Sequence, residues 1–577
     1  MSKERTPKEA QGFLRRREMF SGFELVIFPL VTVVLIFMVV VPLGVLVYGG
    51  LTSVPMGSLS LDFTLKNYFD FFSNWRYLEA LWHTIEIAVL TTLLAGAIGL
   101  FLAWLVGRTD VPMARLIQIS VMAPFFMSPF MGALAWGTLM APNVGLLNKI
   151  LGFVGIGPLN IYSISGMVWV MSLYYTPYVF IFVNSALQNM DPQLEESGAM
   201  SGLNRRQVIF RITLPLVSPA ILSGMLLTFV ASAGQFGVPA LLGTPFNFYV
   251  MTTYIFDLTH NFPGQFNLAA SFSIVLLLIA SVGVWAQNRL MRGKTYTTVT
   301  GKGFRPRLIE LGPLRWPAFG VAISFLLLTV GLPLYILGYV SLIPLYVGDY
   351  SFNLLTLDNY KEVFLENQIA ARAIGNTLFL AFTGATLGVL LGVVISSITL
   401  RSRLWYRKIL DYIVILPVCV PAVVLGMALL WTYVFVPLPI YGTIWLLLIG
   451  YVTGFLPFAV RAITSSMVQI DKSLEEAATM VGASWLRTIK EVTFPLLRPG
   501  LIAGWMLLFI IFVRELAVSI FLYSPRNEVL SVMIYNRWEE GDYTALSAMA
   551  MTQVAFIAIV MVGMGFLFRI DLTKSQT

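Results

Sequence analysis

The sequence has very little of two residue types on which many protein sites depend. Its 577 residues include one cysteine, Cys419, and two histidines, His83 and His260. A single cysteine excludes a disulfide framework and a cysteine metal cluster within one chain. Neither histidine belongs to a ligand spacing such as His-Glu-x-x-His. We therefore predict no metal site, and we interpret both histidines as residues at the outer ends of membrane spans.

Charged side chains are also scarce. Only 11% of the residues are charged and 58% are hydrophobic, with a mean hydropathy of +0.81. Such a chain is far too apolar for a water-soluble domain of this length, so we predict that the lipid bilayer is its environment. The formal net charge of +8 does not indicate a nucleic-acid partner, because the basic residues concentrate in alternate loops, as membrane orientation demands.

Two further features are missing. The sequence contains no Gly-x-x-x-x-Gly-Lys-Ser/Thr phosphate-binding loop, which predicts that the chain does not hydrolyse ATP itself. It also has no paired aspartates or His-Glu motifs inside an apolar run, which argues against an intramembrane enzyme. We predict a non-catalytic chain with no catalytic residue and no cofactor of its own.

Long apolar runs fill most of the remaining sequence. The first, Leu25–Val47, is too long for the core of a signal peptide and is predicted to be an uncleaved membrane span. These runs predict an all-α polytopic membrane protein with about 12 transmembrane helices. The other eleven spans are predicted at 82–107, 116–140, 163–187, 216–240, 268–288, 318–342, 374–400, 409–435, 440–463, 499–522 and 545–569.

The spans divide the chain into two halves of six. A first half is predicted at 25–288 and a second at 318–569, joined by a basic linker at 289–317. The basic N-terminus, 1–24, and the tail, 570–577, flank them. Lys and Arg favour cytoplasmic loops, so both ends and the linker are predicted to be cytoplasmic.

A polar stretch recurs in the two halves, 280 positions apart. Asp191–Gly224 and Asp471–Gly504 align without a gap and share 12 of 34 residues. Because each half holds an even number of spans, the two copies keep the same orientation. This predicts parallel duplicates related by a pseudo-twofold axis along the membrane normal, with a substrate path between them.

Each copy of the polar stretch predicts a helix, a glycine turn and a second helix. In the first copy Asp191 is a good N-cap, and Gly202 suits a left-handed turn. Asn204 can cap a second short helix, which is predicted to end before Pro215. The second copy has Asp471, Gly482, Ser484 and Pro495 at the matching positions.

Shorter matches support the duplication. Leu65-Lys66-Asn67-Tyr68 resembles Leu357-Asp358-Asn359-Tyr360, and His83-Thr84 resembles Asn376-Thr377. Proline-rich runs also occur at matched places in spans three and nine. Proline kinks a helix and frees backbone carbonyls, which suits either a moving gate or a static bundle. These runs are Ala123-Pro124 to Ser128-Pro129 and Leu416-Pro417 to Val420-Pro421.

The polar stretch also resembles a known family. Its groups Glu196-Ser197-Gly198, Gly202 and Ile212-Thr213-Leu214-Pro215 are similar to the EAA loop of permease subunits of bacterial ATP-binding-cassette (ABC) importers. Both copies depart mildly: the first has Ser197-Gly198 in place of two alanines, and the second has Val and Phe in its terminal group. The resemblance implies a type I ABC importer permease fold, in which this loop docks on an ATPase. The ATPase-coupling residues that it implies are Glu195, Glu196, Gly202, Arg205, Arg206, Pro215, Glu475, Glu476, Gly482, Arg487 and Pro495.

The resemblance further implies partners and a location. Two cytoplasmic ABC ATPases would bind ATP and Mg, and a periplasmic solute-binding protein would deliver the solute across a bacterial inner membrane. Fused permeases of this size, with a stretch like Arg514-Glu515-Leu516, resemble those of ferric-iron importers. Phosphonates, sugar phosphates, thiamine and polyamines are the alternative solutes. A secondary carrier is a further alternative, but it needs no ATPase-docking loop.

Arg514 and Glu515 lie inside the predicted span 499–522, where ionisable groups are costly. The offset of 280 places Gln235 opposite them. Our hypothesis is that these three residues line the central passage, with Glu515 meeting a cationic solute. The alternative is a salt bridge that fastens two spans together. For the basic residues of the polar stretches, contact with ATPase carboxylates and anchoring at anionic headgroups are equally open.

Overall fold

The computed structural model describes residues 22–291, 308–348, 350, 352–402, 404–436 and 438–568. Within these ranges every named element is helical, and extended backbone pairs only at two isolated β-bridges. Ten helices are long and apolar enough to cross a membrane, and two sharply bent helix pairs bring the number to 12. The predicted helical class is confirmed. The predicted N-terminal segment, linker and tail lie mostly or wholly outside the described residues.

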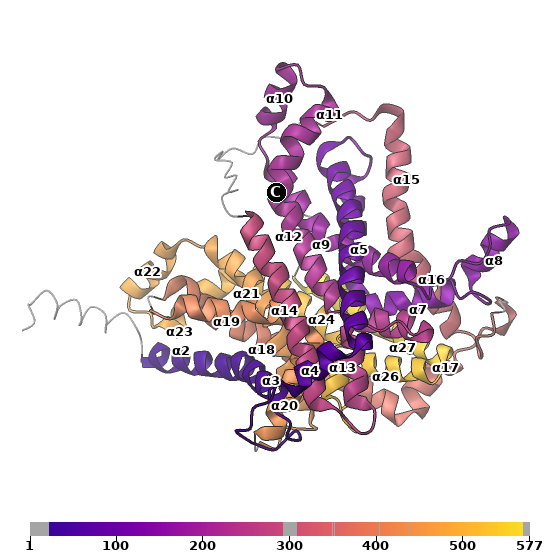
Figure 1. Ribbon diagram of the computed structural model, residues 1–577. Coiled ribbons are helices and arrows are strands. Elements are labelled where there is room, and N and C mark those ends of the chain that lie inside the picture. The colour runs from indigo at the N-terminus through magenta and orange to yellow at the C-terminus, as the bar shows by residue number, and fades with distance from the viewer. Residues whose placement is uncertain are drawn as a thin grey trace, which may run out of the picture.

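The first half runs from the N-terminal span to a long helix that leads toward the linker (Figure 1). Its elements are α2 (Gly22–Leu35), η1 (Ile36–Val40), α3 (Val41–Gly50), α4 (Lys66–Ser73), α5 (Trp75–Arg108), α6 (Ala114–Met122), η2 (Ala123–Phe126), α7 (Pro129–Leu139), α8 (Leu146–Phe153), α9 (Ile164–Asn189), α10 (Pro192–Met200), α11 (Arg205–Val208), η3 (Ile209–Thr213), α12 (Leu214–Ala233), η4 (Pro239–Gly243), η5 (Thr244–Phe246), α13 (Met251–His260) and α14 (Phe266–Met291).

The second half repeats this order almost element for element. Its elements are η6 (Gly312–Leu314), α15 (Arg315–Leu326), η7 (Leu327–Gly331), α16 (Leu332–Ser341), η8 (Phe352–Leu354), α17 (Asp358–Lys361), η9 (Glu362–Glu366), α18 (Gln368–Arg401), α19 (Arg407–Cys419), α20 (Ala422–Phe435), α21 (Ile444–Val468), α22 (Lys472–Met480), α23 (Trp485–Thr488), η10 (Ile489–Thr493), α24 (Phe494–Val513), α25 (Ser519–Leu522), α26 (Leu530–Glu539) and α27 (Tyr543–Phe568).

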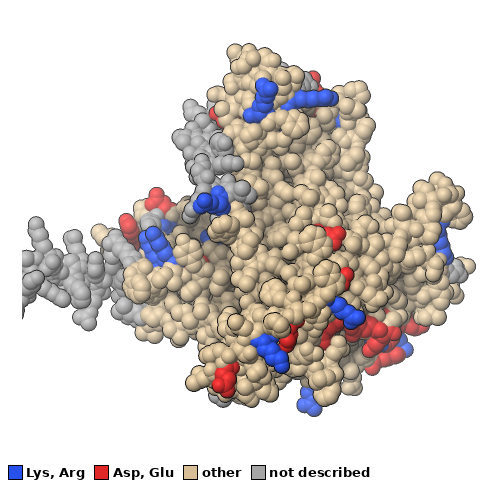
Figure 2. Space-filling model, in the orientation of Figure 1, with Lys and Arg blue, Asp and Glu red and all other residues tan. Residues whose placement is uncertain are grey.

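Three long helices form the centre of each half. Helices α5, α9 and α12 pack on one another in the first half, and α18, α21 and α24 do the same in the second. Small residues allow this close approach. A Cβ atom on Gly99 of α5 would lie 2.9 Å from the Cβ of Val179 in α9. Charged side chains gather mainly near the ends of the helices, with a broad uncharged surface between them on the face that Figure 2 shows.

The first span of each half packs against the other half. Helix α3 lies against α20 and α14, and α16 lies in the equivalent position against α7 and α27. At the first of these contacts, Gly49 sits on the indole ring of Trp431, which is fully buried. At the second, the Tyr174 hydroxyl of α9 donates a hydrogen bond to the carbonyl of Thr329 in η7 (2.9 Å). The two halves are therefore interlocked.

The polar stretches fold locally as predicted. Asp191 Oδ1 accepts a hydrogen bond from Gln193 N (2.9 Å), Gly202 has φ +85°, and Asn204 Oδ1 accepts from Gln207 N (2.9 Å). The second copy repeats these features: Asp471 Oδ1 accepts from Ser473 N at 2.9 Å, Gly482 has φ +86°, and Ser484 Oγ accepts from Arg487 N at 3.4 Å.

One local prediction is wrong. The helical backbone of each polar stretch does not stop before Pro215 or Pro495. It continues into α12 or α24, and each proline lies in the first turn of that helix. A π-helical segment directly precedes each of these helices, ending at Thr213 and Thr493. The wider π turn relieves the clash between the proline ring and the carbonyl four residues earlier, so the chain continues as a helix.

Spans three and nine are not continuous. The predicted span 116–140 is a pair of helices bent by 94°, and 409–435 is a pair bent by 112°. The breaks fall at the matched proline runs. In the first, Ser128 starts a new helix, since its Oγ accepts a hydrogen bond from Met131 N (3.1 Å) directly before Pro129. Proline at this position fits a helix start and not a helix interior.

The interlocked packing predicts different effects for two glycines of α3. A Cβ on Gly49 would lie 2.9 Å from the Trp431 ring, whereas a Cβ on Gly44 would meet nothing within 4 Å. We expect Gly49→Ala to destabilise the protein by about 1–3 kcal/mol through overpacking. The matched control, Gly44→Ala, should cost nothing. Thermal unfolding in detergent checks this, and equal midpoints for both variants would contradict the packing.

Candidate functional site

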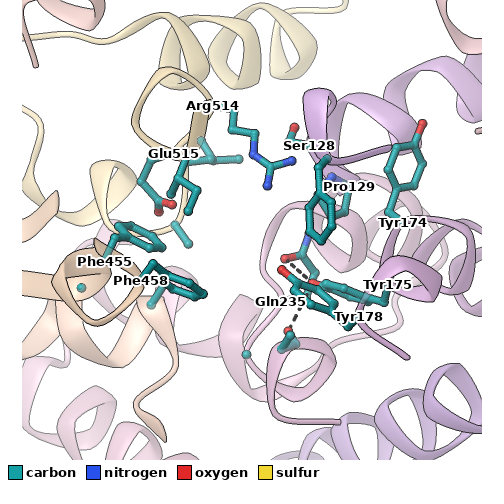
Figure 3. Close-up of a pocket in the computed structure, with 18 of the residues that line it drawn as sticks. Ser128, Pro129, Tyr174, Tyr175, Tyr178, Gln235, Phe455, Phe458, Arg514 and Glu515 are labelled. Atoms are coloured by element: carbon teal, nitrogen blue, oxygen red, sulfur yellow. Dashed lines mark hydrogen bonds between the residues drawn. The ribbon is translucent and has the colours of Figure 1, made fainter. Parts of the chain in front are cut away.

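A cavity of about 490 Å³ lies between the two halves. Its walls come from the η2–α7 break, α9 and the end of α12 in the first half. In the second half they come from the α19–α20 break, α21 and the end of α24. Most of the lining is apolar or aromatic, with a few polar groups on both sides (Figure 3). An apolar cavity with few polar groups between two halves is a typical ligand passage.

The three residues predicted to line the passage do line this cavity, but not from within helices. Helix α12 ends at Ala233 and α24 ends at Val513, so Gln235, Arg514 and Glu515 lie in turns. The predicted continuous spans 216–240 and 499–522 are thus wrong at these points. A turn inside a membrane protein must find partners for its backbone groups.

Those partners are hydroxyl groups in matched positions. Thr252 Oγ1 of α13 donates a hydrogen bond to the carbonyl of Gln235 (2.8 Å). In the second half, Ser531 Oγ of α26 donates to the carbonyl of Glu515. Each turn is therefore held by the short helix that follows it, and the polar side chains of the cavity are fixed in place.

Arg514 and Glu515 do not pair with each other. Arg514 Nη1 donates a hydrogen bond to the carbonyl of Met127 in the other half (2.6 Å), and Glu515 Oε1 accepts one from Val518 N (2.8 Å). Figure 3 shows the two side chains diverging. Among the described residues neither forms an ion pair within 4 Å, so the alternative of a fastening salt bridge has no support here.

The cavity also contains aromatic residues that the sequence analysis did not single out. Tyr175 and Tyr178 of α9 line the first-half wall, and Phe455 and Phe458 of α21 line the second-half wall. The Tyr175 hydroxyl lies 3.2 Å from Gln235 Oε1, to which it donates. These residues are related by the same offset of 280, with a proline inside each group. The offset could therefore have identified these residues from the sequence. Of the two matched pairs, only the one on the first-half wall carries hydroxyl groups.

An aromatic cluster lies beside the Gln235 turn of the cavity. It joins the halves, because Tyr535 of α26 lies 5.6 Å from Phe236 and 5.8 Å from Phe256 of α13, between ring centroids. Phe521 of α25 also contacts Phe256 (6.3 Å). Rings at these distances attract one another beyond the burial of their area. The cluster thus links α13 of the first half to α25 and α26 of the second.

Matched polar contacts hold the two short helices α13 and α26 beside this cluster. Thr84 Oγ1 accepts a hydrogen bond from Met251 N (2.9 Å), and Thr377 Oγ1 accepts one from Leu530 N (2.8 Å). The neighbouring His83 contacts a backbone carbonyl through Nδ1. The matched pairs His83-Thr84 and Asn376-Thr377 are therefore caps for these helices.

A carboxyl group of α13 lies close to an acidic residue of the other half. Burial, and secondarily the charge of Glu539 on α26, raise the pKa of Asp257 to about 6. Both effects disfavour the charged carboxylate. Within the described residues, no group of three or more His, Cys, Asp or Glu side chains is arranged to hold a metal ion.

Helices α10 and α22 lie at the tips of their halves (Figure 1). The long helices α12 and α24 separate the polar stretches from the turns that line the cavity. Each polar stretch presents a large apolar side chain to the surroundings: Met200 is 90% exposed and Met480 is 88% exposed. The predicted coupling residues Glu196, Arg206, Glu476 and Arg487 are exposed as well.

The other predicted coupling residues are placed differently. Glu195 and Glu475 are only partly exposed and form ion pairs with Arg108 and Arg401. Gly202 and Gly482 form the left-handed turns. Pro215 and Pro495 lie in the helices that follow, and the side chain of Arg205 is outside the described residues.

Comparison with known proteins gives the family. The chain matches the family of binding-protein-dependent transport system inner membrane components twice, over residues 95–295 and 368–572. It is 27% identical to the ferric transport system permease protein FbpB of Actinobacillus pleuropneumoniae over 491 residues, which cover 82% of this chain and 68% of that protein.

More distant relatives match one half or less. The spermidine/putrescine transport system permease protein PotC of Escherichia coli K12 is 26% identical over 41% of this chain and 92% of its own length. A solved bacterial alginate ABC transporter, in complex with an alginate-bound periplasmic protein, covers 41% of this chain and 83% of its own, with 23% identity and a TM-score of 0.35. With two matches to one family model in a single polypeptide, this chain belongs to the family of binding-protein-dependent transport system inner membrane components, as a fused permease with two repeats.

Proposed function

We propose that this chain is the permease subunit of an ATP-driven importer of ferric iron, and that the cavity between its halves is the solute path. One observation carries the proposal. The two polar stretches are attached to α12 and α24, and the other ends of these two helices form the turns that line the cavity. Movement of the polar stretches therefore reaches the cavity through two single helices.

The proposed partners follow from the family. Two cytoplasmic ABC ATPases bind α10 and α22, and ATP and Mg bind to the ATPases, while this chain holds no cofactor and catalyses no reaction. The side with α10 and α22 is then cytoplasmic, with both termini on that side of a bacterial inner membrane. A periplasmic binding protein docks on the opposite side. ATP-driven rocking of the halves opens the cavity to that side.

Ferric iron is the proposed solute because FbpB, a ferric transport permease by name, is similar along most of this chain. The cavity adds oxygen groups from Glu515, Gln235, Tyr175 and Tyr178. A polyamine is the second candidate. The similarity to PotC supports it, and so do the ring faces of Phe455 and Phe458 near a carboxylate, since ammonium groups bind both.

Replacing the exposed methionines should uncouple the chain from its ATPases. Met200→Asp with Met480→Asp places a charge in each apolar contact, which should weaken ATPase binding by about 2 kcal/mol or more, as at an interface hot spot. Co-purification of the ATPases with the tagged permease measures this. Met113→Asp is the matched control, because Met113 is 60% exposed and lies outside both polar stretches. Full retention of the ATPases by the double variant would contradict the docking site.

Removing the carboxylate in the cavity should slow transport. We expect Glu515→Gln to reduce ATP-driven uptake by about tenfold or more, which corresponds to the loss of a contact of about 1.4 kcal/mol. Uptake of ⁵⁵Fe and of labelled spermidine is measured in proteoliposomes that contain the ATPases and the binding protein. Glu366→Gln, at an exposed residue away from the cavity, should transport normally. A Glu515→Gln variant with full assembly and full uptake would rule out a pathway role.

A further inference from the structure

We propose that Glu195 and Glu475 are the mechanical joints of the two coupling helices, with Arg108 and Arg401 as the residues that position them. The inference rests on the proposed function, because it concerns how ATPase movement enters the membrane part. It assigns different roles to the two glutamates of each polar stretch, and it adds two arginines that lie outside those stretches.

The second half shows the joint most completely. Glu475 of α22 lies 3.3 Å from Arg401 Nε, and its Oε1 accepts a hydrogen bond from Thr493 Oγ1 (3.2 Å). Both charged side chains are mostly buried, with exposed fractions of 17% and 20%. Arg401 is the last residue of α18, and Thr493 directly precedes α24. One carboxylate therefore fastens the coupling helix α22 to two long helices.

The first half repeats this arrangement with different surroundings. Glu195 of α10 lies 3.4 Å from Arg108 Nε, and its Oε1 accepts a hydrogen bond from Thr213 Oγ1 (2.6 Å). Arg108 ends α5, and Thr213 directly precedes α12. The two copies share about a third of their residues in this stretch, yet they keep the same three-residue contact. Repetition of the contact indicates that it serves both coupling helices.

The joint connects the coupling helix to the cavity. Helices α12 and α24 each have 20 residues, so each is a rod of about 30 Å with the joint at one end and a cavity turn at the other. At the far ends lie Gln235 in one case and Arg514 with Glu515 in the other. A displacement of α22 is thus carried along α24 to the charged residues.

Burial makes the joint stronger than other ion pairs on the same side. Arg487 and Glu491, also in the second polar stretch, are 66% and 57% exposed, and pairs of this kind add little stability. Glu475 lies 3.3 Å from the Arg401 guanidinium and accepts a charge-assisted hydrogen bond from the Thr493 hydroxyl, in a position more shielded than that of the Arg487–Glu491 pair. By contrast Glu196 and Glu476, one position further along each helix, are exposed at the surface.

The two joints differ in one respect. Arg401 also donates through Nη2 to the carbonyl of Met467 (3.1 Å), in the last turn of α21, and to that of Ile470 (2.7 Å), just beyond it. In the described part of the chain, Nη1 and Nη2 of Arg108 have no hydrogen-bond partner. The joint of the second half therefore ties three long helices to the coupling helix, and its loss should have the larger effect.

Measuring both ATP hydrolysis and uptake tests the joint in the complete complex of permease, two ATPases and loaded binding protein in proteoliposomes. For Arg401→Gln and for Glu475→Gln we expect retained ATPases, and a rise in ATP hydrolysed per solute imported of about fivefold or more, within the range usual for coupling between sites. Arg401→Lys should restore part of the coupling. Arg108→Gln should show a smaller rise.

The control is Arg461→Gln, because Arg461 pairs with Asp411 at 3.7 Å on exposed surface and touches neither coupling helix in its ion pair. The double variant Arg401→Gln with Glu475→Gln should be no worse than either single variant, since both remove one contact. An unchanged ratio in both single variants, or additive effects in the double variant, would overturn the joint. Absence of ATP-driven uptake by the wild-type complex would instead overturn the proposed function.

Discussion

A break in a membrane helix frees backbone N–H and C=O groups, and the bilayer core has no hydrogen-bond partner for them. The protein must therefore supply these partners itself. The cavity turns at Gln235 and Glu515 receive hydroxyl groups from Thr252 and Ser531. The carbonyl of Thr329, four residues before Pro333, receives the hydroxyl of Tyr174 from the other half. Irregular backbone at this depth is stable because the opposite half and the short helices α13 and α26 supply these donors.

Duplication gives the protein a symmetric frame with an asymmetric passage. The joints, the caps of α13 and α26 and the central helix triplets all occur twice. The charged and hydroxyl-bearing side chains that face the cavity do not repeat. Gly234 packs against Pro421 where the second half has Arg514 reaching Met127, and two tyrosines stand opposite two phenylalanines. The charged side chains of the cavity, Arg514 and Glu515, therefore belong to the second-half wall alone.

Pattern reasoning predicted the helices, their number and the fold of the polar stretches, because these follow from local rules of hydrophobicity and capping. It failed where a contact distant in sequence decides the outcome. Nothing near Val513 in the sequence shows that α24 ends there, since the turn depends on the hydroxyl of Ser531 in α26. The role of Arg401 was equally hidden, because a terminal arginine is expected to anchor at headgroups. Its partner Glu475 lies in another element.

The first span of each half packs against the other half, and this affects how the protein can fold during synthesis. Helix α3 emerges from the ribosome long before α20, its neighbour in the finished fold. At about 5–20 residues per second this interval is roughly 20–70 s. During that time the N-terminal span lies in lipid without its contact with α20, so that Gly49 is not yet covered by Trp431. The first span is therefore inserted into the membrane before its neighbour α20 has been synthesised. The rate of translation is thus expected to affect the folding yield.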